Sequence, residues 1–364
     1  MVASVVGGGA AEAASPQWRV VQGAPLGPYG TGLADVAATG PQDVWAVGYG
    51  CAREKHTSCP AIARWNGDQW KNVTMPAYRV PAKTYDTFDP DLYNFEAVHA
   101  ASPNDVWVVG NGLNVQVGHW NGRSWSMYRP FGVSENNHLS DVEVGRGRVW
   151  FAGTSAYDRG TVLSWSGRAG FTQEYVVNGS LAAVSAGSRT GEIWAVGSEN
   201  THGPLVVRGT GQGGDVRWEE LSTPSIPGGT LTGVWPISAD DVWAIGYIGT
   251  RYSFELSKPL ALHFNGKSWS RVPLPVAKGR LTGITADSSR NMWVSGVDLS
   301  HPKQALFLQY SQGKWISTYG PKFQLGSVSA VSISRIPGSN GMWAVGRGGE
   351  VEDERDKAFI LRYG

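Results

Sequence analysis

The stretch Asp43-Val44-Trp45-Ala46-Val47-Gly48 decides the fold, because the chain repeats it. Each copy keeps a tryptophan followed three positions later by a glycine. The seven tryptophans are 62, 43, 44, 49, 50 and 50 residues apart. Repeats of this period are typical of solenoids, propellers and arrays. The other six copies are Asp105–Gly110, Arg148–Gly153, Glu192–Gly197, Asp241–Gly246, Asn291–Gly296 and Gly341–Gly346.

Each repeat divides into four short segments of strand-like sequence. In the first repeat these are residues 33–37, the segment around Trp45, residues 61–65 and residues 69–73. Asn66-Gly67 separates the last two, and an Asn-Gly pair between alternating apolar residues predicts a hairpin turn with positive φ at both positions. Four antiparallel strands per repeat indicate a propeller blade, so we predict an all-β, seven-bladed β-propeller.

The two ends of the chain predict how the ring closes. The seventh repeat ends at Ala358–Gly364, which matches a third strand and has no fourth strand after it. Gln17–Val21 stands alone before the first repeat and matches a fourth strand. We therefore expect the N-terminal strand to complete the last blade, which leaves no open sheet edge.

Composition narrows the class of protein. A net charge of +1 provides no basic surface for nucleic acid, and no apolar run reaches the length of a membrane span, about 20 residues.

Residues 1–13 are small and apolar and are predicted to be a truncated signal peptide, or alternatively a flexible Ala/Gly tail. Residues 14–364 are then a single propeller domain. Cys51 and Cys59 are predicted to form a loop-closing disulfide in a secreted protein.

The repeat resembles secreted bacterial β-propellers with Trp-Ala-Val-Gly blades, as found in actinobacteria. The resemblance covers Trp18–Gly364 and implies a propeller fold and export. It implies no single function, because propellers host lectins, lyases, hydrolases and scaffolds.

Residues that recur in every blade are expected to be structural. The repeat tryptophans should pack between blades, and the acidic residue two positions before them (Asp43, for example) should accept backbone N–H bonds. The third-strand position of His119 and His263 is held by other polar residues elsewhere, which indicates a solvated edge: Arg64, Ser164, Arg208, Gln309 and Arg362.

Function is expected in the loops in which the blades differ. The connections from second to third strand, and from each blade to the next, are long and emerge on one face. Aromatic side chains mixed with Arg and carboxylates suit neutral polar ligands such as sugars. The predicted ligand-binding residues are Tyr85, Phe88, Tyr93, Tyr157, Arg159, Arg251, Tyr252 and Asp298.

A catalytic site has fewer candidates. Asp35, Glu96 and Asp141 lie near the starts of three innermost strands, where carboxylates could act as acid and base or hold Ca²⁺. Glu96 is one register step from the other two, so at least one of the three could instead bond a backbone amide between blades. Asp86, Asp89 and Asp91 offer closely spaced oxygen ligands but lack the glycine and final glutamate of a calcium loop.

The leading hypothesis is a secreted, non-enzymatic protein that binds an extracellular glycan or a partner protein, as a monomer or within a secreted complex. No cofactor is required, although Ca²⁺ remains possible. The alternative is a secreted lyase or hydrolase with acidic residues at the channel mouth.

Overall fold

The structure is a computed structural model, and the residues it describes fall into fifteen segments. These are residues 16–21, 29–51, 60–74, 94–112, 115–130, 138–155, 157–167, 170–187, 191–199, 202–212, 215–250, 254–286, 291–324, 327–349 and 356–364.

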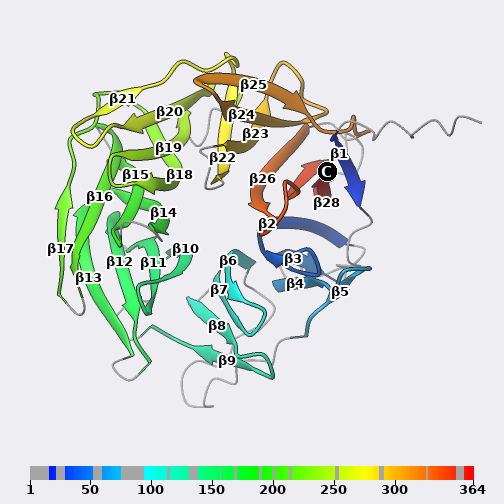
Figure 1. The fold of residues 1–364 in the computed structure, drawn as a ribbon, viewed down its shortest axis with the longest axis horizontal. Helices are drawn as coiled ribbons and strands as arrows, with labels where there is room; N and C mark the ends of the chain where they lie inside the picture. Colours follow the sequence, from blue (N-terminus) through cyan, green and yellow to red (C-terminus); the bar gives the residue numbers. More distant parts are fainter. Residues whose placement is uncertain are drawn as a thin grey trace, which may run out of the picture.

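The described residues form seven four-stranded antiparallel sheets, arranged as blades around a central opening (Figure 1). The predicted all-β, seven-bladed propeller is confirmed. Blade 1 comprises β2 (Tyr29–Gly40), β3 (Asp43–Cys51), β4 (Pro60–Trp65) and β5 (Trp70–Asn72). Blade 2 comprises β6 (Asn94–Ser102), β7 (Asp105–Asn111), β8 (Gln116–Trp120) and β9 (Trp125–Tyr128). Blade 3 comprises β10 (His138–Gly145), β11 (Arg148–Thr154), β12 (Arg159–Trp165) and β13 (Phe171–Asn178). Blades 4 and 5 comprise β14 (Ser180–Ala186), β15 (Ile193–Glu199), β16 (Gly203–Gln212) and β17 (Asp215–Glu220); β18 (Gly229–Ser238), β19 (Asp241–Ile248), β20 (Lys258–Phe264) and β21 (Trp269–Arg271). Blades 6 and 7 comprise β22 (Gly279–Ala286), β23 (Met292–Asp298), β24 (Ala305–Ser311) and β25 (Lys314–Tyr319); β26 (Ser327–Arg335), β27 (Met342–Gly349), β28 (Asp356–Tyr363) and β1 (Trp18–Val21). A 3₁₀ turn, η1 (Phe254–Leu256), lies between β19 and β20.

The ring closes as the sequence predicts. β1 pairs antiparallel with β28, so that Trp18 lies opposite Tyr363 and Val21 opposite Ile360. Figure 1 shows β1 beside β28, at the two ends of the colour scale. The first and last strands of the domain therefore share one sheet, and the edge of β28 is covered.

Tryptophan pairs join neighbouring blades. The fourth-strand tryptophan of one blade lies nearly perpendicular to the repeat tryptophan of the blade before it. Trp125 meets Trp45 with ring centroids 5.7 Å apart at 83°, and Trp269 meets Trp194 at 5.9 Å and 80°. Such T-shaped pairs bury large areas and offer an indole N–H a π-acceptor. The predicted role of the repeat tryptophans in packing between blades is confirmed.

The glycine that closes the repeat is required by a close backbone approach in six of the seven repeats. A Cβ atom on Gly197 would overlap the carbonyl oxygen of Ser180 on the adjacent strand β14. The same overlap would occur at Gly48, Gly153, Gly246, Gly296 and Gly346.

We expect Gly197→Ala to lower the free energy of unfolding by about 3 kcal/mol, because a backbone carbonyl cannot move aside as a flexible side chain can. Gly40→Ala is the control, since nothing lies within 4 Å of a Cβ at that position. Denaturant unfolding of both variants checks the prediction, and equal stabilities would contradict it.

The Asn-Gly turns form with different geometry from the one predicted. Gly67 has a φ of 100°, whereas Asn66 is not among the described residues with positive φ. Asn66 instead accepts two backbone N–H bonds with Oδ1, from Asp68 at 3.1 Å and Gln69 at 3.0 Å. The prediction of positive φ at both positions was wrong, because the asparagine side chain satisfies the turn and only the glycine needs the unusual backbone.

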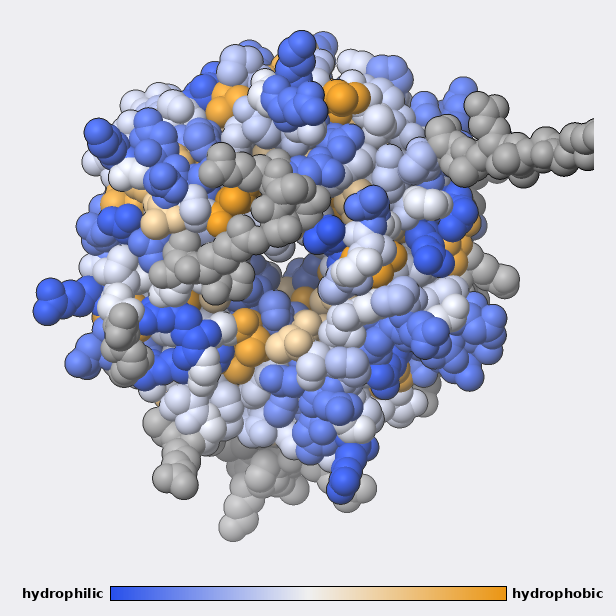
Figure 2. Space-filling model, in the orientation of Figure 1, coloured by the Kyte–Doolittle hydropathy of each residue, from blue (hydrophilic) through white to orange (hydrophobic). Residues whose placement is uncertain are grey.

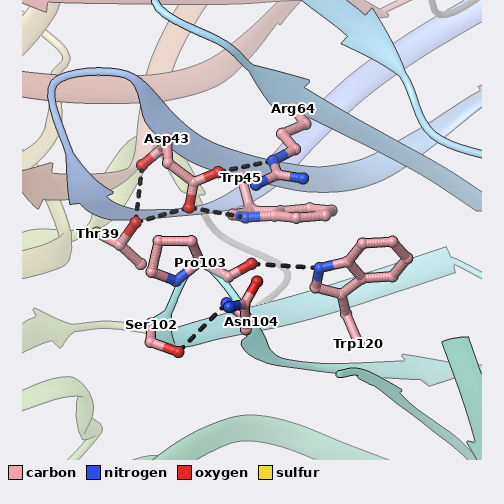
Figure 3. Close-up of polar contacts among 8 residues, drawn as sticks. All are labelled: Thr39, Asp43, Trp45, Arg64, Ser102, Pro103, Asn104 and Trp120. Atoms are coloured by element: carbon pink, nitrogen blue, oxygen red, sulfur yellow. Dashed lines mark hydrogen bonds and ion pairs between the residues drawn. The ribbon is translucent and has the colours of Figure 1, made fainter. Parts of the chain in front are cut away.

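Four of the seven repeats have an acidic residue two positions before the tryptophan, and in the first repeat it bonds side chains instead of the predicted backbone N–H groups. Asp43 accepts a bond from the Trp45 indole at 3.4 Å and pairs with Arg64 at 2.6 Å (Figure 3). The Arg64 guanidinium also lies 4.6 Å from the centroid of the Trp45 ring. The third-strand position is therefore part of a partly buried ion pair on tryptophan rather than a solvated edge.

The same arrangement recurs with histidine in place of arginine. His119 Nε2 lies 2.9 Å from Asp105, and His263 Nε2 lies 2.9 Å from Asp241. Each histidine also lies against the repeat tryptophan of its own blade. These two histidines therefore hold strands together, as their recurrence in the repeat suggested.

Two predictions concern residues whose placement is not described. Residues 1–13, the predicted signal peptide, lie outside the described residues, as do Cys59 and the side chain of Cys51. Among the described residues, no helix is long and apolar enough to cross a membrane.

Candidate functional site

The first strand of every blade lines a central channel. The channel encloses a cavity of about 490 Å³, and Figure 2 shows it as a hollow at the centre of the ring. Six titratable side chains line it: Asp35, Glu96, His99, Asp141, Glu143 and Arg335.

A register shift in each first strand sets which side chains occupy equivalent places. β2 shifts between Leu33 and Asp35, and β10 shifts between Leu139 and Asp141, so the two aspartates are equivalent. The equivalent residue of β6 is Ala97, since its shift follows Phe95. Glu96 thus lies one position earlier, and the one-step difference expected from the sequence is confirmed.

Asp35 joins three blades. Its Oδ1 accepts bonds from the Val36 amide at 2.8 Å and from the Ser332 hydroxyl of blade 7 at 2.6 Å. Its Oδ2 accepts a bond from the Val98 amide of blade 2 at 2.8 Å. Both oxygens of this carboxylate are therefore engaged at the junction where the ring closes.

Asp141 repeats this arrangement two blades further on. It accepts bonds from its neighbour Val142 and from the Val184 amide of blade 4, both at 2.8 Å. In blades 5 and 6 a threonine one position earlier, equivalent to Glu96, makes the connection: Thr232 donates to the Leu281 carbonyl at 2.8 Å, and Thr282 to the Ala330 carbonyl at 2.6 Å. The polar residues at the starts of the inner strands therefore connect several neighbouring blades: 1 to 2, 3 to 4, 5 to 6, 6 to 7 and 7 to 1.

These contacts change the interpretation of the three candidate catalytic residues. The sequence left open that one of the three bonds a backbone amide between blades, and the structure shows that both aspartates do. Glu96 instead lies 4.0 Å from His138 Nε2, and both side chains are partly exposed. The main role of these two carboxylates is to connect blades, because breaking their bonds to backbone amides would leave partly buried N–H groups unpaired.

A partly buried ion pair in the channel was not predicted from the sequence. His99 Nδ1 lies 2.8 Å from Glu143 Oε2, which joins β6 of blade 2 to β10 of blade 3. Side chains two positions apart on a strand share a face. Glu143 is two residues after Asp141, and His99 is two after Ala97, so alignment of the repeats could have placed both in the channel.

Burial raises the pKa values of the two channel aspartates. Burial raises the pKa of Asp35 to about 6, against bonds from Ser332, Val98 and Val36 that lower it. Burial also raises the pKa of Asp141 well above its usual value, and the charge of Asp35 adds to the rise. For His99, burial alone would lower the pKa, but the Glu143 carboxylate outweighs it, so the pKa is raised.

Metal ligation is not supported in the part of the chain that the structure describes. There, no group of three or more His, Cys, Asp or Glu side chains is arranged to hold a metal ion. The loop aspartates Asp86, Asp89 and Asp91 lie outside the described residues.

The predicted ligand-binding residues fall into three groups. Tyr157, 84% exposed, and the exposed Arg159 lie where β11 connects to β12. Asp298 is buried instead, and accepts bonds from the His301 ring at 2.8 Å and the Tyr319 hydroxyl at 2.7 Å, so it anchors its own loop. The remaining residues lie outside the described part of the chain: Tyr85, Phe88, Tyr93, Arg251 and Tyr252.

Comparison with known proteins identifies similar folds and no family. No protein-family model matches the sequence, and no curated protein matches it. Among solved structures, YCF48 bound to D1 peptide matches with a TM-score of 0.60 at 16% identity, covering 95% of this chain and 96% of that chain.

Two further structures support the same fold. YCF48 from Cyanidioschyzon merolae matches with a TM-score of 0.60 at 13% identity, covering 95% of this chain and 98% of that chain. The WD40 β-propeller domain of Doa1 also reaches 0.60, at 10% identity, covering 96% and 97%. Likeness at these identities concerns the fold, and activity has to be argued from the residues of this chain.

Proposed function

We propose that this chain is a secreted protein-interaction module that binds a polypeptide on its loop-bearing face. This face is formed by the connections from second to third strand and from each blade to the next. Export rests on the composition of residues 1–13, and binding rests on the surface described below.

The observation that supports polypeptide binding is that large apolar side chains are exposed on the loop-bearing face. Among the described residues, Tyr157 is 84% exposed, Leu256 76% and Phe254 36%. All three lie in connections from second to third strand, at the same end of their blades. The other exposed large apolar residues, Val20 and Ile316, lie on fourth strands at the outer rim. Exposed apolar side chains on one face are typical of interaction sites.

Two further points favour binding over catalysis. Both channel aspartates accept bonds between blades, which favours a connecting role over the acid and base roles of the alternative hypothesis. The similar solved structures include a WD40 domain and a propeller bound to a peptide.

Selection from a random peptide display library tests the proposal. We expect peptides that bind the wild-type chain, and we expect Leu256→Ser combined with Tyr157→Ser to weaken their binding about tenfold or more, as for loss of an interface hot spot. Ile316→Ser is the matched control, because Ile316 is 52% exposed on the outer rim. Binding is measured by fluorescence anisotropy.

A glycan array run in parallel covers the other ligand class expected from the sequence. If only glycans bind, or if the rim and face variants behave alike, the polypeptide proposal fails.

A further inference from the structure

Arg280 is held in place at the start of β22, on the loop-bearing face. Its Nε donates to the Ser257 hydroxyl at 2.9 Å, and its Nη2 donates to the Thr250 carbonyl at 2.8 Å. Its guanidinium lies 4.1 Å from the ring centroid of Tyr247 and 4.6 Å from that of Phe254. Contacts from two aromatic rings and two oxygens orient the side chain before any ligand arrives.

This guanidinium has no acidic partner within the described residues. Its two contacts use two of the five N–H groups of an arginine, and no carboxylate there lies within ion-pair distance. Burial lowers the pKa of Arg280, and the nearby charge that opposes this is only that of Tyr247. Three of the four described arginines that lie on a tryptophan ring have a paired carboxylate, as Arg64 has Asp43. The Arg280 guanidinium is thus stacked on aromatic rings, held in one orientation, and has further N–H groups that could bind a ligand.

Lysines surround it on the same face of blades 5 and 6. Lys258 and Lys278 are exposed, and the backbone bond from Gly279 to Ser257, 2.8 Å long, holds their two segments together. Backbone bonds from Leu299 to Lys278 and from Phe323 to Lys303 extend this surface across blade 6.

The charge of this surface is mainly positive, with one exposed acid, Glu255. Residues 247–250, 254–258, 276–281, 298–304 and 320–324 contain five Lys or Arg and two Asp or Glu. One of the two acids, Asp298, is buried and bonded to His301 and Tyr319. The whole chain carries a net charge of only +1, so positive charge is concentrated here.

We propose that this surface, centred on Arg280, binds an acidic peptide segment, with the guanidinium holding a carboxylate and Leu256 and Phe254 contacting an adjacent apolar side chain. The proposal rests on the proposed function and names its ligand. Arginine donors in a fixed fork match a carboxylate, and aromatic and Arg side chains are enriched at binding hot spots. Nucleic acid fits less well, because the cations occupy two blades only and adjoin exposed apolar side chains.

The test uses the peptides selected by the wild-type chain from the random library. We expect Asp and Glu to be enriched among them, and we expect replacement of those residues by Asn and Gln to weaken binding about tenfold. That measurement uses the wild-type protein, so it does not depend on how any variant folds.

Substitutions at Arg280 test whether this residue binds the acidic side chains of the peptides. Arg280→Gln is expected to weaken binding of the acidic peptides about tenfold and to have no further effect on the amide peptides, since the two changes remove one interaction. Arg280→Lys should be intermediate, because it keeps the charge and loses the fork. Arg217→Gln, on the exposed outer strand β17, is the control and should bind as wild type.

Two outcomes would overturn the proposal in distinguishable ways. Selected peptides without acidic enrichment, bound equally by Arg280→Gln, would refute the acidic ligand and leave the interaction module standing. A library that yields no binding peptide at all would refute both.

Discussion

Trp18→Ala is expected to lower the free energy of unfolding by about 3–5 kcal/mol, the usual cost of removing a buried Trp or Phe. Trp18 is 6% exposed and is the one buried side chain of β1. Its ring stacks on Phe307 with centroids 3.7 Å apart and lies nearly perpendicular to Trp293 at 6.3 Å. Without this side chain, a strand of four residues keeps only its backbone bonds to β28.

Loss of β1 should also expose a sheet edge. The freed edge of β28 would present unpaired backbone groups, so we expect the variant to self-associate. Light scattering and chemical unfolding measure the two effects. Val20→Ala is the control on the same strand, because Val20 is 53% exposed. If both variants were equally stable and monomeric, the closing role assigned to Trp18 would be wrong.

The stability of the wild-type protein is expected to fall as the pH rises from about 4 to about 7. Burial raises the pKa of Asp35 from 3.8 to about 6 and that of Asp141 well above 3.8. The folded state therefore binds more protons than the unfolded state in this window, and stability is lost as the pH rises through the folded pKa values. Asp35 alone corresponds to a loss on the order of 1–3 kcal/mol.

The other shifted groups do not reverse this trend. The raised pKa of His99 adds stability that is lost as the pH rises above about 6.5, which has the same sign. The lowered pKa of Asp298 acts below pH 3.8, outside the window. The remaining titratable side chains that line the channel are Glu96, Glu143 and Arg335.

Asparagine variants test this dependence. Asp35→Asn keeps one oxygen to accept the Val98 amide bond but places an NH2 donor beside the Val36 amide, so the fold should persist with lower stability while the charge is lost. We expect the double variant Asp35→Asn with Asp141→Asn to melt at a lower temperature than wild type, because each asparagine loses one acceptor, and to show a flatter dependence of the melting temperature on pH between pH 4 and pH 7. Asp68→Asn, on an exposed turn, should retain the wild-type slope. A double variant with the wild-type slope would show that the channel aspartates do not titrate as assigned.

Several features of this protein follow from the sequence alone because their signals are local and repeated. The recurring tryptophan and glycine determined the number of blades, and the unmatched segments at Trp18 and Phe359 determined the closure. Strand alternation also placed Glu96 one register step from Asp35. Each of these depends on spacing within one repeat or on comparison between repeats, and both are visible in a linear sequence.

Only the tertiary structure decided what the polar side chains do. Asp35 bonds Val98 and Ser332, which are 63 and 297 positions away in the chain. Arg280 becomes an oriented cation only because Tyr247 and Phe254 are brought against it from another blade. A sequence shows which residues carry charge. The free energy of the charged form depends on how far the group is buried and on its hydrogen-bond and ion-pair partners. Both are set only when distant strands pack into a ring.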